Sequence, residues 1–304
     1  MEKVTNDHGQ TIIQLKHPSG ATCEVYLFGA TITKFVTASG RDVIWVSSTA
    51  RLDGTKAIRG GIPLVFPHFG TPIKDMAQHG FARNSLWTLE GDAMAVEGTE
   101  DLRCVLSLDN KVATHEAWAH PYRLEYSVTL GAETLATTLT VHNVGEQPFN
   151  FMDLQHTYIN VGDVLSTSVS GLQGVQYFDK ASDDPDRACT DERQAANVGE
   201  FTDRIYFPTE SKPIPDPVVI VSPLGNISVS KKAAATTADG PVDLPVDTVL
   251  WNPWAEKGAG MPDFEEDGHL RMLCVEPGLV KGFQTLAPKA SASLTQILCT
   301  TNSL

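Results

Sequence analysis

The fold class is decided by the segment Tyr122–Asn143, which reads YRLEYSVTLGAETLATTLTVHN. Apolar and polar residues alternate on both sides of a short turn at Gly131–Glu133. A period of two puts the apolar side chains on one face of an extended strand and the polar ones on the other. Two such runs joined by a glycine-containing turn are typical of a β-hairpin with one solvated face. The segment therefore predicts two antiparallel strands.

Similar strand-like stretches occur elsewhere in the chain, and 24 glycines and 18 prolines interrupt it too often for long helices. No amphipathic helix longer than about ten residues is evident. Many short strands with frequent turns predict an all-β fold, most simply a β-sandwich. The further candidate strands are Ala21–Leu27, Leu102–Leu108, Val218–Val221, Ile227–Ser230 and Leu294–Leu298.

The length of 304 residues allows two average domains or one large β-sandwich. No internal repeat divides the chain. The most polar segment, Ala181–Asn197, has strand-like sequence on both sides, so we interpret it as a long surface loop rather than a domain linker. A second loop is expected at Lys231–Leu244. We therefore predict a single domain over residues 1–304.

The charge balance excludes several classes of partner. Lysine and arginine total 23 against 37 aspartates and glutamates, a net charge of −14, so the surface repels nucleic acid and anionic membranes. No apolar run approaches the roughly 18 residues of a membrane span, and the N-terminus does not resemble a secretory signal. The cysteines are scattered and odd in number, so we expect a reduced, cytoplasmic protein without disulfides. They are Cys23, Cys104, Cys189, Cys274 and Cys299.

Two neighbouring segments, Ile58–Gly70 and Gln78–Arg83, are loop-like and rich in glycine. The pair Gly60–Gly61 would permit close approach of the backbone to a ligand. Arg59 and Arg83 could clamp an anion such as phosphate. The plainer alternative is a glycine-rich turn with surface arginines. The segment is not a P-loop, because it lacks the spacing of that motif.

A histidine and a glutamate are candidates for acid–base chemistry. Strand alternation places Asp153 and Gln155 on one face and Leu154 and His156 on the other. A lone histidine in an apolar strand is either a hydrogen-bonded core residue or part of a site with a carboxylate partner. Glu276 ends an apolar strand before a Pro-Gly turn. It is either a partly buried carboxylate with a tuned pKa or a solvated turn residue.

No metal or cofactor site is expected from the sequence. The histidines of His115–His120 are five residues apart and point to different faces of a helix. The acidic run Asp183–Asp186 lacks the glycine and the final glutamate of a calcium loop. No glycine motif for a dinucleotide follows a strand.

Taken together, six ordered segments resemble the aldose 1-epimerase superfamily, and within it most of all the hexose-6-phosphate mutarotases (glucose-6-phosphate 1-epimerases). The resemblance covers nearly the whole chain. It implies a large, mostly antiparallel β-sandwich of the galactose mutarotase-like (supersandwich) type. The segments are Arg59–Pro63, Gln78–Arg83, Leu154–Tyr158, Phe201–Tyr206, Val249–Trp254 and Cys274–Pro277.

The resemblance implies interconversion of the α and β anomers of a hexose 6-phosphate, without metal or cofactor. It places the general base at Glu276 and the general acid at His156. The partner is then a small phosphosugar. The sequence itself leaves the oligomeric state open and slightly favours a monomer. The remaining matched positions are implied to bind substrate: Arg59 and Arg83 the 6-phosphate, Gln78 and His79 the sugar, Asp203 its hydroxyls and Trp254 its apolar face.

The chain departs from the family pattern in two places. His68 stands where a glutamine is common, and Ala181–Asn197 is longer and more acidic than usual. Two alternatives stay open: an aldose 1-epimerase acting on unphosphorylated galactose or glucose, and a non-catalytic carbohydrate-binding protein. The paired arginines favour a phosphosugar, and this hypothesis requires a basic pocket on an acidic protein.

Overall fold

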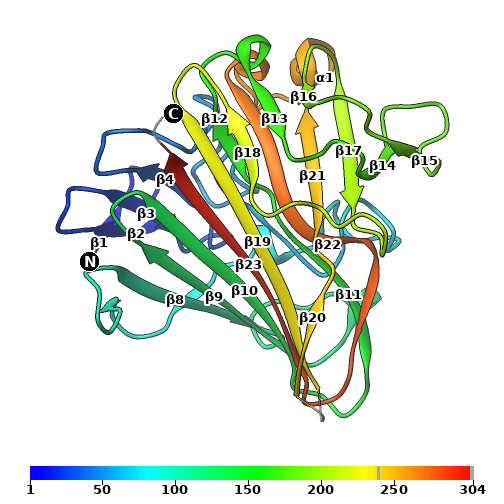
Figure 1. Ribbon diagram of the computed structural model, residues 1–304. Helices are drawn as coiled ribbons and strands as arrows, with labels where there is room; N and C mark the ends of the chain where they lie inside the picture. Colours follow the sequence, from blue (N-terminus) through cyan, green and yellow to red (C-terminus); the bar gives the residue numbers. More distant parts are fainter. Residues whose placement is uncertain (238–239, 302–304) are drawn as a thin grey trace.

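A computed structural model describes residues 1–237 and 240–301 (Figure 1). Every pairing between its named strands is antiparallel, which confirms the all-β sandwich. In the part of the chain that the structure describes, regular helix is limited to α1 (Trp254–Ala259) and four 3₁₀ turns. These turns lie at Ala82–Asn84, Glu116–Trp118, Val164–Ser166 and Gly268–Leu270. Within the described ranges, no helix is both long and apolar enough to cross a membrane.

The first large sheet contains the predicted hairpin at its centre, formed by β9 and β10. Leu130 pairs with Leu135 next to the turn, and buried residues alternate with half-buried ones along both strands. In order across the sheet, the strands are β16 (Ala195–Asn197), β13 (Ser168–Ser170), β18 (Val218–Val221), β19 (Asn226–Thr237), β23 (Ser291–Thr301), β10 (Thr134–Asn143), β9 (Tyr122–Leu130), β8 (Leu102–Asp109) and β6 (Thr88–Leu89), with β20 (Gly240–Leu244) beside β19 and β7 (Met94–Ala95) beside β8.

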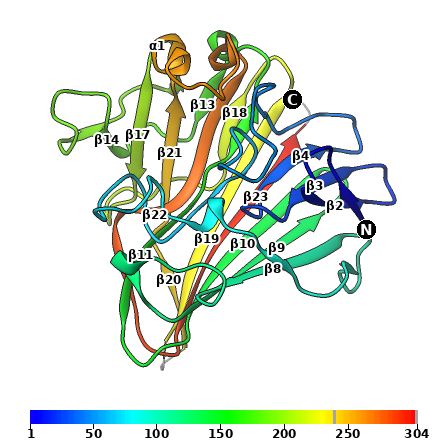
Figure 2. The ribbon, with the colours of Figure 1, turned by 180° about the vertical axis from the view of Figure 1, so that it is seen from behind.

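The second large sheet packs against the first, and its other face carries the candidate site described below. Figures 1 and 2 show the long strands of both sheets converging toward one end of the molecule. In order, the strands are β15 (Ala188–Thr190), β14 (Gln176–Asp179), β17 (Thr202–Phe207), β21 (Asp247–Asn252), β22 (Met272–Leu286), β11 (Phe149–Gln155) and β5 (Leu64–Val65), with β12 (Tyr158–Asn160) beside β22.

A smaller sheet of four strands precedes them, and it is drawn in blue in Figure 2. Its buried residues join the same apolar core as those of the two large sheets. The strands are β1 (Glu2–Thr5), β2 (Thr11–Lys16), β3 (Thr22–Tyr26) and β4 (Ile32–Val36).

A buried polar contact joins the two large sheets and fixes which face of β11 looks inward. The side chain of Gln155 accepts a hydrogen bond from the Thr137 hydroxyl at 2.6 Å and donates one to the carbonyl of Leu294 at 3.1 Å. Leu154 instead packs with Ile205 and Val249 in a separate cluster. The predicted alternation is therefore confirmed. Gln155 faces the main core, whereas Leu154 and His156 face away from it.

Two sequence predictions about loops need correction. Lys231–Leu244 is not a loop, because β19 continues to Thr237 and pairs with β20, while residues 238–239 lie outside the described part. The alanines and lysines of β19 are weak strand formers, yet β19 pairs with β23 from Asn226 to Thr236. Such long-range pairing overrides local propensity. Ala181–Asn197 is a loop only in part, since it contains β15 and β16.

Candidate active site

A cavity of about 1130 Å³ lies on the face of the second sheet that is turned away from the main core. Tyr206 and Leu250 belong to the main core, whereas their neighbours Ile205 and Val249 line the cavity. The segments around Arg59, Phe69–Pro72 and Gln78–Arg83 supply other parts of the wall. The fold thus brings residues from much of the chain to one hollow.

The antiparallel register explains why residues far apart in sequence meet on the cavity floor. One row runs across neighbouring strands through Phe178, Ile205, Val249 and Glu276. Side chains at such opposed positions point to the same face. A second row, displaced by two residues along the strands, passes through Asp203, Trp251, Cys274 and Tyr158.

His156 and Glu276 form the centre of the site. The Nδ1 atom of His156 lies 3.4 Å from Oε1 of Glu276. The His156 ring is stacked on Tyr158, with ring centroids 4.7 Å apart and 9° between the planes, and the rings of Trp251 and His79 approach it edge-on. His156 is 7 % exposed and Glu276 is 1 % exposed. These contacts hold the imidazole in one orientation beside the carboxyl group.

Burial disfavours charge on both members of the pair. It lowers the pKa of His156 well below its usual value, and the positive charges of Arg83 and Arg59 lower it further. Burial raises the pKa of Glu276 well above its usual value, assisted by Asp203 and opposed by Arg83. Both directions favour an uncharged pair, with a neutral imidazole and a protonated carboxyl group.

The two predicted arginines both line the cavity, but their surroundings differ. Arg59 is held by Asp263, with Nε 3.2 Å from Oδ1, and Lys56 contacts the same carboxylate at 3.1 Å. Among the described residues no carboxylate forms an ion pair with Arg83, which donates a hydrogen bond to the carbonyl of Gln78 at 2.9 Å. Burial lowers the pKa of Arg83 to about 10, so it still carries its charge at neutral pH.

Three lysines that the sequence analysis missed also line the cavity. Each has its ammonium group over a phenylalanine ring, a contact that favours a cation on an apolar wall. The cavity wall thus contains five arginines and lysines against three carboxylates, Asp186, Asp203 and Glu276. The basic pocket required on this acidic protein is present. The pairs are Lys180 with Phe178 at 5.4 Å, Lys257 with Phe201 at 3.4 Å and Lys281 with Phe207 at 3.9 Å.

Of the other predicted binding residues, three line the cavity and one does not. Gln78, His79 and Asp203 line the cavity, and burial raises the pKa of Asp203 to about 6. Trp254 does not line it: this residue borders an adjoining recess of about 520 Å³. The aromatic wall of the main cavity is Trp251 instead. Its position could have been found from strand alternation, since Trp251 is two residues from Val249 on β21.

The glycine pair and His68 have roles other than ligand contact. A Cβ atom on Gly60 would overlap the backbone of Trp45 and Val46, and one on Gly61 would overlap the carbonyl of Ile32. The two glycines let the chain pack against its own backbone next to Arg59, and neither lines the cavity. His68 is fully buried and does not line the cavity.

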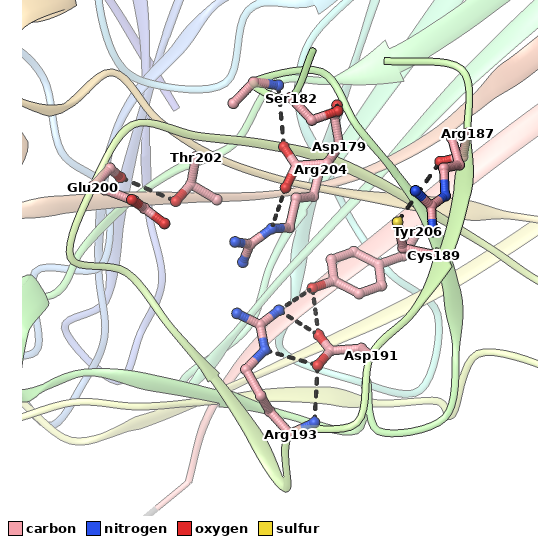
Figure 3. A network of polar contacts seen from close by, with 11 residues as sticks. Asp179, Ser182, Arg187, Cys189, Asp191, Arg193, Glu200, Thr202, Arg204 and Tyr206 are labelled. Carbon is pink, nitrogen blue, oxygen red and sulfur yellow. Dashed lines mark hydrogen bonds and ion pairs between the residues drawn. The ribbon is translucent and has the colours of Figure 1, made fainter. Parts of the chain in front are cut away.

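The acidic loop is anchored behind one wall of the cavity by a polar network (Figure 3). Asp191 accepts hydrogen bonds from the Arg193 guanidinium at 2.6 and 2.8 Å and from the Tyr206 hydroxyl at 2.7 Å. Arg204 binds Asp179 at 3.3 Å. Because Tyr206 lies on β17 beside the lining residue Ile205, the network ties the loop to a strand of the site.

One group of side chains in the described residues has the composition of a metal site. The potential ligand atoms of His156, Cys274 and Glu276 all lie within 4.8 Å of one another, and the three residues are buried. The expectation of no metal site rested on two short motifs that lack the spacing of metal ligands. His156 follows β11 and is far in sequence from Cys274 and Glu276, which lie on β22. No short motif reveals such a grouping.

Comparisons with known proteins agree with this architecture. The family described as Aldose 1-epimerase matches residues 11–299. A protein of Cenchrus ciliaris named "Putative glucose-6-phosphate 1-epimerase" is 30 % identical over 94 % of this chain and 84 % of its own length. A protein of the same name from Escherichia coli is 29 % identical, with 94 % and 88 % covered.

Solved structures show the same fold. A crystal structure described as a "putative mutarotase" from Salmonella typhimurium superposes with a TM-score of 0.83 at 25 % identity, covering 99 % of this chain and 93 % of that one. Galactose 1-epimerase from Lactobacillus acidophilus has a TM-score of 0.71 at 16 % identity, covering 100 % and 98 %. The second likeness concerns the fold alone.

Proposed function

The chain belongs to the aldose 1-epimerase family, and we propose that it interconverts the α and β anomers of aldohexose 6-phosphates such as glucose 6-phosphate. The observation that carries this proposal is the 3.4 Å approach of His156 and Glu276 on the floor of a cation-rich cavity. The family membership supports the reaction class, and the cations support the phosphorylated substrate.

The chemistry requires an acid and a base that converge on one carbon atom. Ring opening removes the proton from O1 of the hemiacetal and delivers a proton to the ring oxygen O5, and both oxygens are bonded to C1. Glu276 accepts the O1 proton as general base, and protonated His156 donates a proton to O5 as general acid. Each positioned proton transfer contributes about 10²–10⁴ to the rate.

The pair returns to its starting state without exchanging protons with water. After ring opening, Glu276 carries the proton and His156 is neutral. Rotation about C1–C2 presents the other face of the aldehyde. His156 then accepts the proton of the O5 hydroxyl while Glu276 protonates the carbonyl oxygen, which closes the other anomer. The uncharged pair that burial favours is therefore the protonation state that the site has while the sugar is in its open-chain form.

The phosphate group is assigned to the cationic part of the wall. Arg83 is the stronger candidate, because no carboxylate pairs with it, whereas Arg59 already binds Asp263. A guanidinium binds phosphate through directed, charge-assisted hydrogen bonds. We assign Gln78, His79 and Asp203 to the sugar hydroxyls and Trp251 to the apolar face of the pyranose.

Exchange NMR with both anomers at equilibrium tests the proposal. We expect the protein to accelerate α/β exchange of glucose 6-phosphate with a kcat/KM well above that for glucose or galactose. Equal or greater efficiency with the unphosphorylated sugars would identify a general aldose 1-epimerase instead. Binding of sugar phosphate without faster exchange would indicate a carbohydrate-binding protein.

We further propose that the protein acts as a single-domain monomer in the cytoplasm, where sugar phosphates are formed. The five cysteines are unpaired in the structure, which fits a reducing compartment. Light scattering of the purified protein measures the oligomeric state directly, and a mass twice that of one chain would contradict the monomer.

A further inference from the structure

Cys274 lies directly beside the acid–base pair. It precedes Glu276 by two residues on β22, so both side chains point to the same face of the sheet. Its strand position is paired with that of Tyr158, whose ring stacks on His156. One ring nitrogen of His156, the Sγ atom of Cys274 and one carboxylate oxygen of Glu276 thus lie within 4.8 Å of one another.

The polar atoms of this group have unused bonding capacity. Neither Nδ1 of His156 nor either carboxylate oxygen of Glu276 has a hydrogen-bond partner among the described residues. Buried polar atoms are nearly always paired, so each unpaired one requires an explanation. A cation bound between the His156 imidazole and the Glu276 carboxylate, beside the Cys274 thiol, would give these atoms a partner.

We propose that His156, Cys274 and Glu276 bind a thiophilic divalent cation, for which Zn²⁺ is the best fit, and that this ion excludes the sugar from the acid–base pair. Nitrogen, thiolate and carboxylate are the ligands that Zn²⁺ takes. Nitrogen and oxygen ligands at about 2.0–2.2 Å from a tetrahedral ion lie roughly 3.3–3.6 Å apart. The separation of Nδ1 and Oε1 is 3.4 Å.

Binding would displace protons and leave one coordination position open. The Cys274 thiol and the His156–Glu276 pair each release a proton to solvent, giving a thiolate, a neutral imidazole and a carboxylate. His156 and Glu276 both line the cavity, so the ion enters from there and its fourth position faces the substrate space. The metal site does not depend on the proposed reaction; only its inhibitory effect rests on that function.

Metal titration of the chelator-treated protein tests the site directly. We expect one Zn²⁺ per chain by calorimetry, and with Co²⁺ as probe an absorption band from thiolate-to-metal charge transfer. Cys274→Ser should weaken Zn²⁺ binding at least about 100-fold and abolish the band, because losing a ligand costs more than losing an outer partner. Cys104→Ser is the matched control: Cys104 is equally buried but lies on β8 of the other large sheet.

Zn²⁺ or Co²⁺ binding that is unchanged in Cys274→Ser would overturn the proposal, as would the absence of binding by the wild-type protein. Circular dichroism establishes that the variants are folded. If Cys274→Ser does not fold, Glu276→Gln provides the second test and should also weaken binding about 100-fold, while unchanged affinity would contradict the site.

Inhibition provides a separate readout. Zn²⁺ should slow glucose 6-phosphate exchange by the wild-type protein, with recovery after chelation, and more than about 100-fold higher Zn²⁺ should be needed in Cys274→Ser. Equal sensitivity of the two proteins would contradict inhibition through this site. A protein without exchange activity would refute the proposed function, and the metal titration would still decide the site.

Discussion

The imidazole of His156 lies parallel to the phenol ring of Tyr158, with centroids 4.7 Å apart and 9° between the planes. Tyr158 is 2 % exposed and itself packs against Trp45 and Trp251. His156 and Tyr158 are two residues apart on extended backbone, so their side chains point to the same face. The stack therefore gives the proposed acid a fixed ring plane, and Tyr158 is a positioning residue for His156.

Replacing the aromatic ring should therefore lower kcat more than it affects substrate binding. Tyr158→Phe keeps the stack and should retain kcat within a few-fold. Tyr158→Leu removes the flat surface and should lower kcat about 10–100-fold, because small misplacements of a catalytic group are costly. Steady-state exchange rates separate kcat from KM, and thermal unfolding monitors folding. A leucine variant with unchanged kcat would show that the stack does not position His156.

Arg83 should determine the preference for phosphorylated sugars. Arg83→Met removes charge-assisted hydrogen bonds worth about 1.5–3 kcal/mol, so kcat/KM for glucose 6-phosphate should fall roughly 10–150-fold. The ratio of kcat/KM for glucose 6-phosphate to that for glucose should fall by a similar factor. Lys56→Met is the control, since Lys56 binds Asp263 and does not line the cavity. A ratio unchanged in Arg83→Met would remove Arg83 from the phosphate site.

The same arginine should influence the pH dependence of the reaction. Its positive charge lowers the pKa of both His156 and Glu276, although burial has the larger effect on each. Removing the charge raises both pKa values, so the pH profile of kcat/KM for glucose should move to higher pH in Arg83→Met. A profile that stays in place or moves to lower pH would contradict this coupling.

Asp153 should make the protein less stable as the pH rises. Burial raises the pKa of Asp153 to about 8, and its carboxylate oxygens have no hydrogen-bond partner among the described residues. Between its unfolded pKa near 4 and its folded pKa, the folded state holds a proton that the unfolded state has lost. The free energy of unfolding therefore falls by about 1.4 kcal/mol per pH unit in this window.

The comparison is between wild type and Asp153→Asn, unfolded with denaturant at several pH values from 5 to 8. The asparagine cannot ionise, so the variant should gain stability relative to wild type as the pH rises. Parallel stability curves would show that Asp153 is ionised or solvated in the folded protein.

Gly61 should tolerate no side chain. Gly61 has φ of +76°, and a Cβ atom there would overlap the Ile32 carbonyl, whereas Gly20 has φ of +98° with open space around it. Gly20→Ala should cost about 1 kcal/mol for the left-handed backbone alone. Gly61→Ala should cost several kcal/mol more, measured by denaturant unfolding. Equal losses would mean that the packing at Gly61 adapts without cost.

The sequence predicts the fold class well because alternation is a local signal. The hairpin Tyr122–Asn143 and the strand at Leu102–Leu108 follow it closely. Strand β19 beyond Ser230 does not, since its pairing with β23 is a long-range property that local residues encode weakly. The same reason explains why a loop was expected at Lys231–Leu244.

The site is predictable only where residues are grouped in motifs. Arg59, Arg83, His156 and Glu276 fall in recognisable segments, and all four line the cavity. The three cavity lysines belong to no such motif: Lys180 follows β14, Lys257 lies on α1 and Lys281 lies on β22, so only the folded chain brings them together. The family motif points to Trp254, whereas strand alternation from Val249 points to Trp251, which lines the cavity.

The central claim is that His156 and Glu276 act as one acid–base unit on a phosphorylated sugar. Exchange NMR of glucose 6-phosphate with wild type, His156→Gln, Glu276→Gln and the double variant tests it most directly. The account predicts that each single variant slows exchange by about 10²–10⁴ and that the double variant is little slower than either single one. Wild-type exchange rates in either single variant, or losses that simply multiply in the double variant, would contradict it.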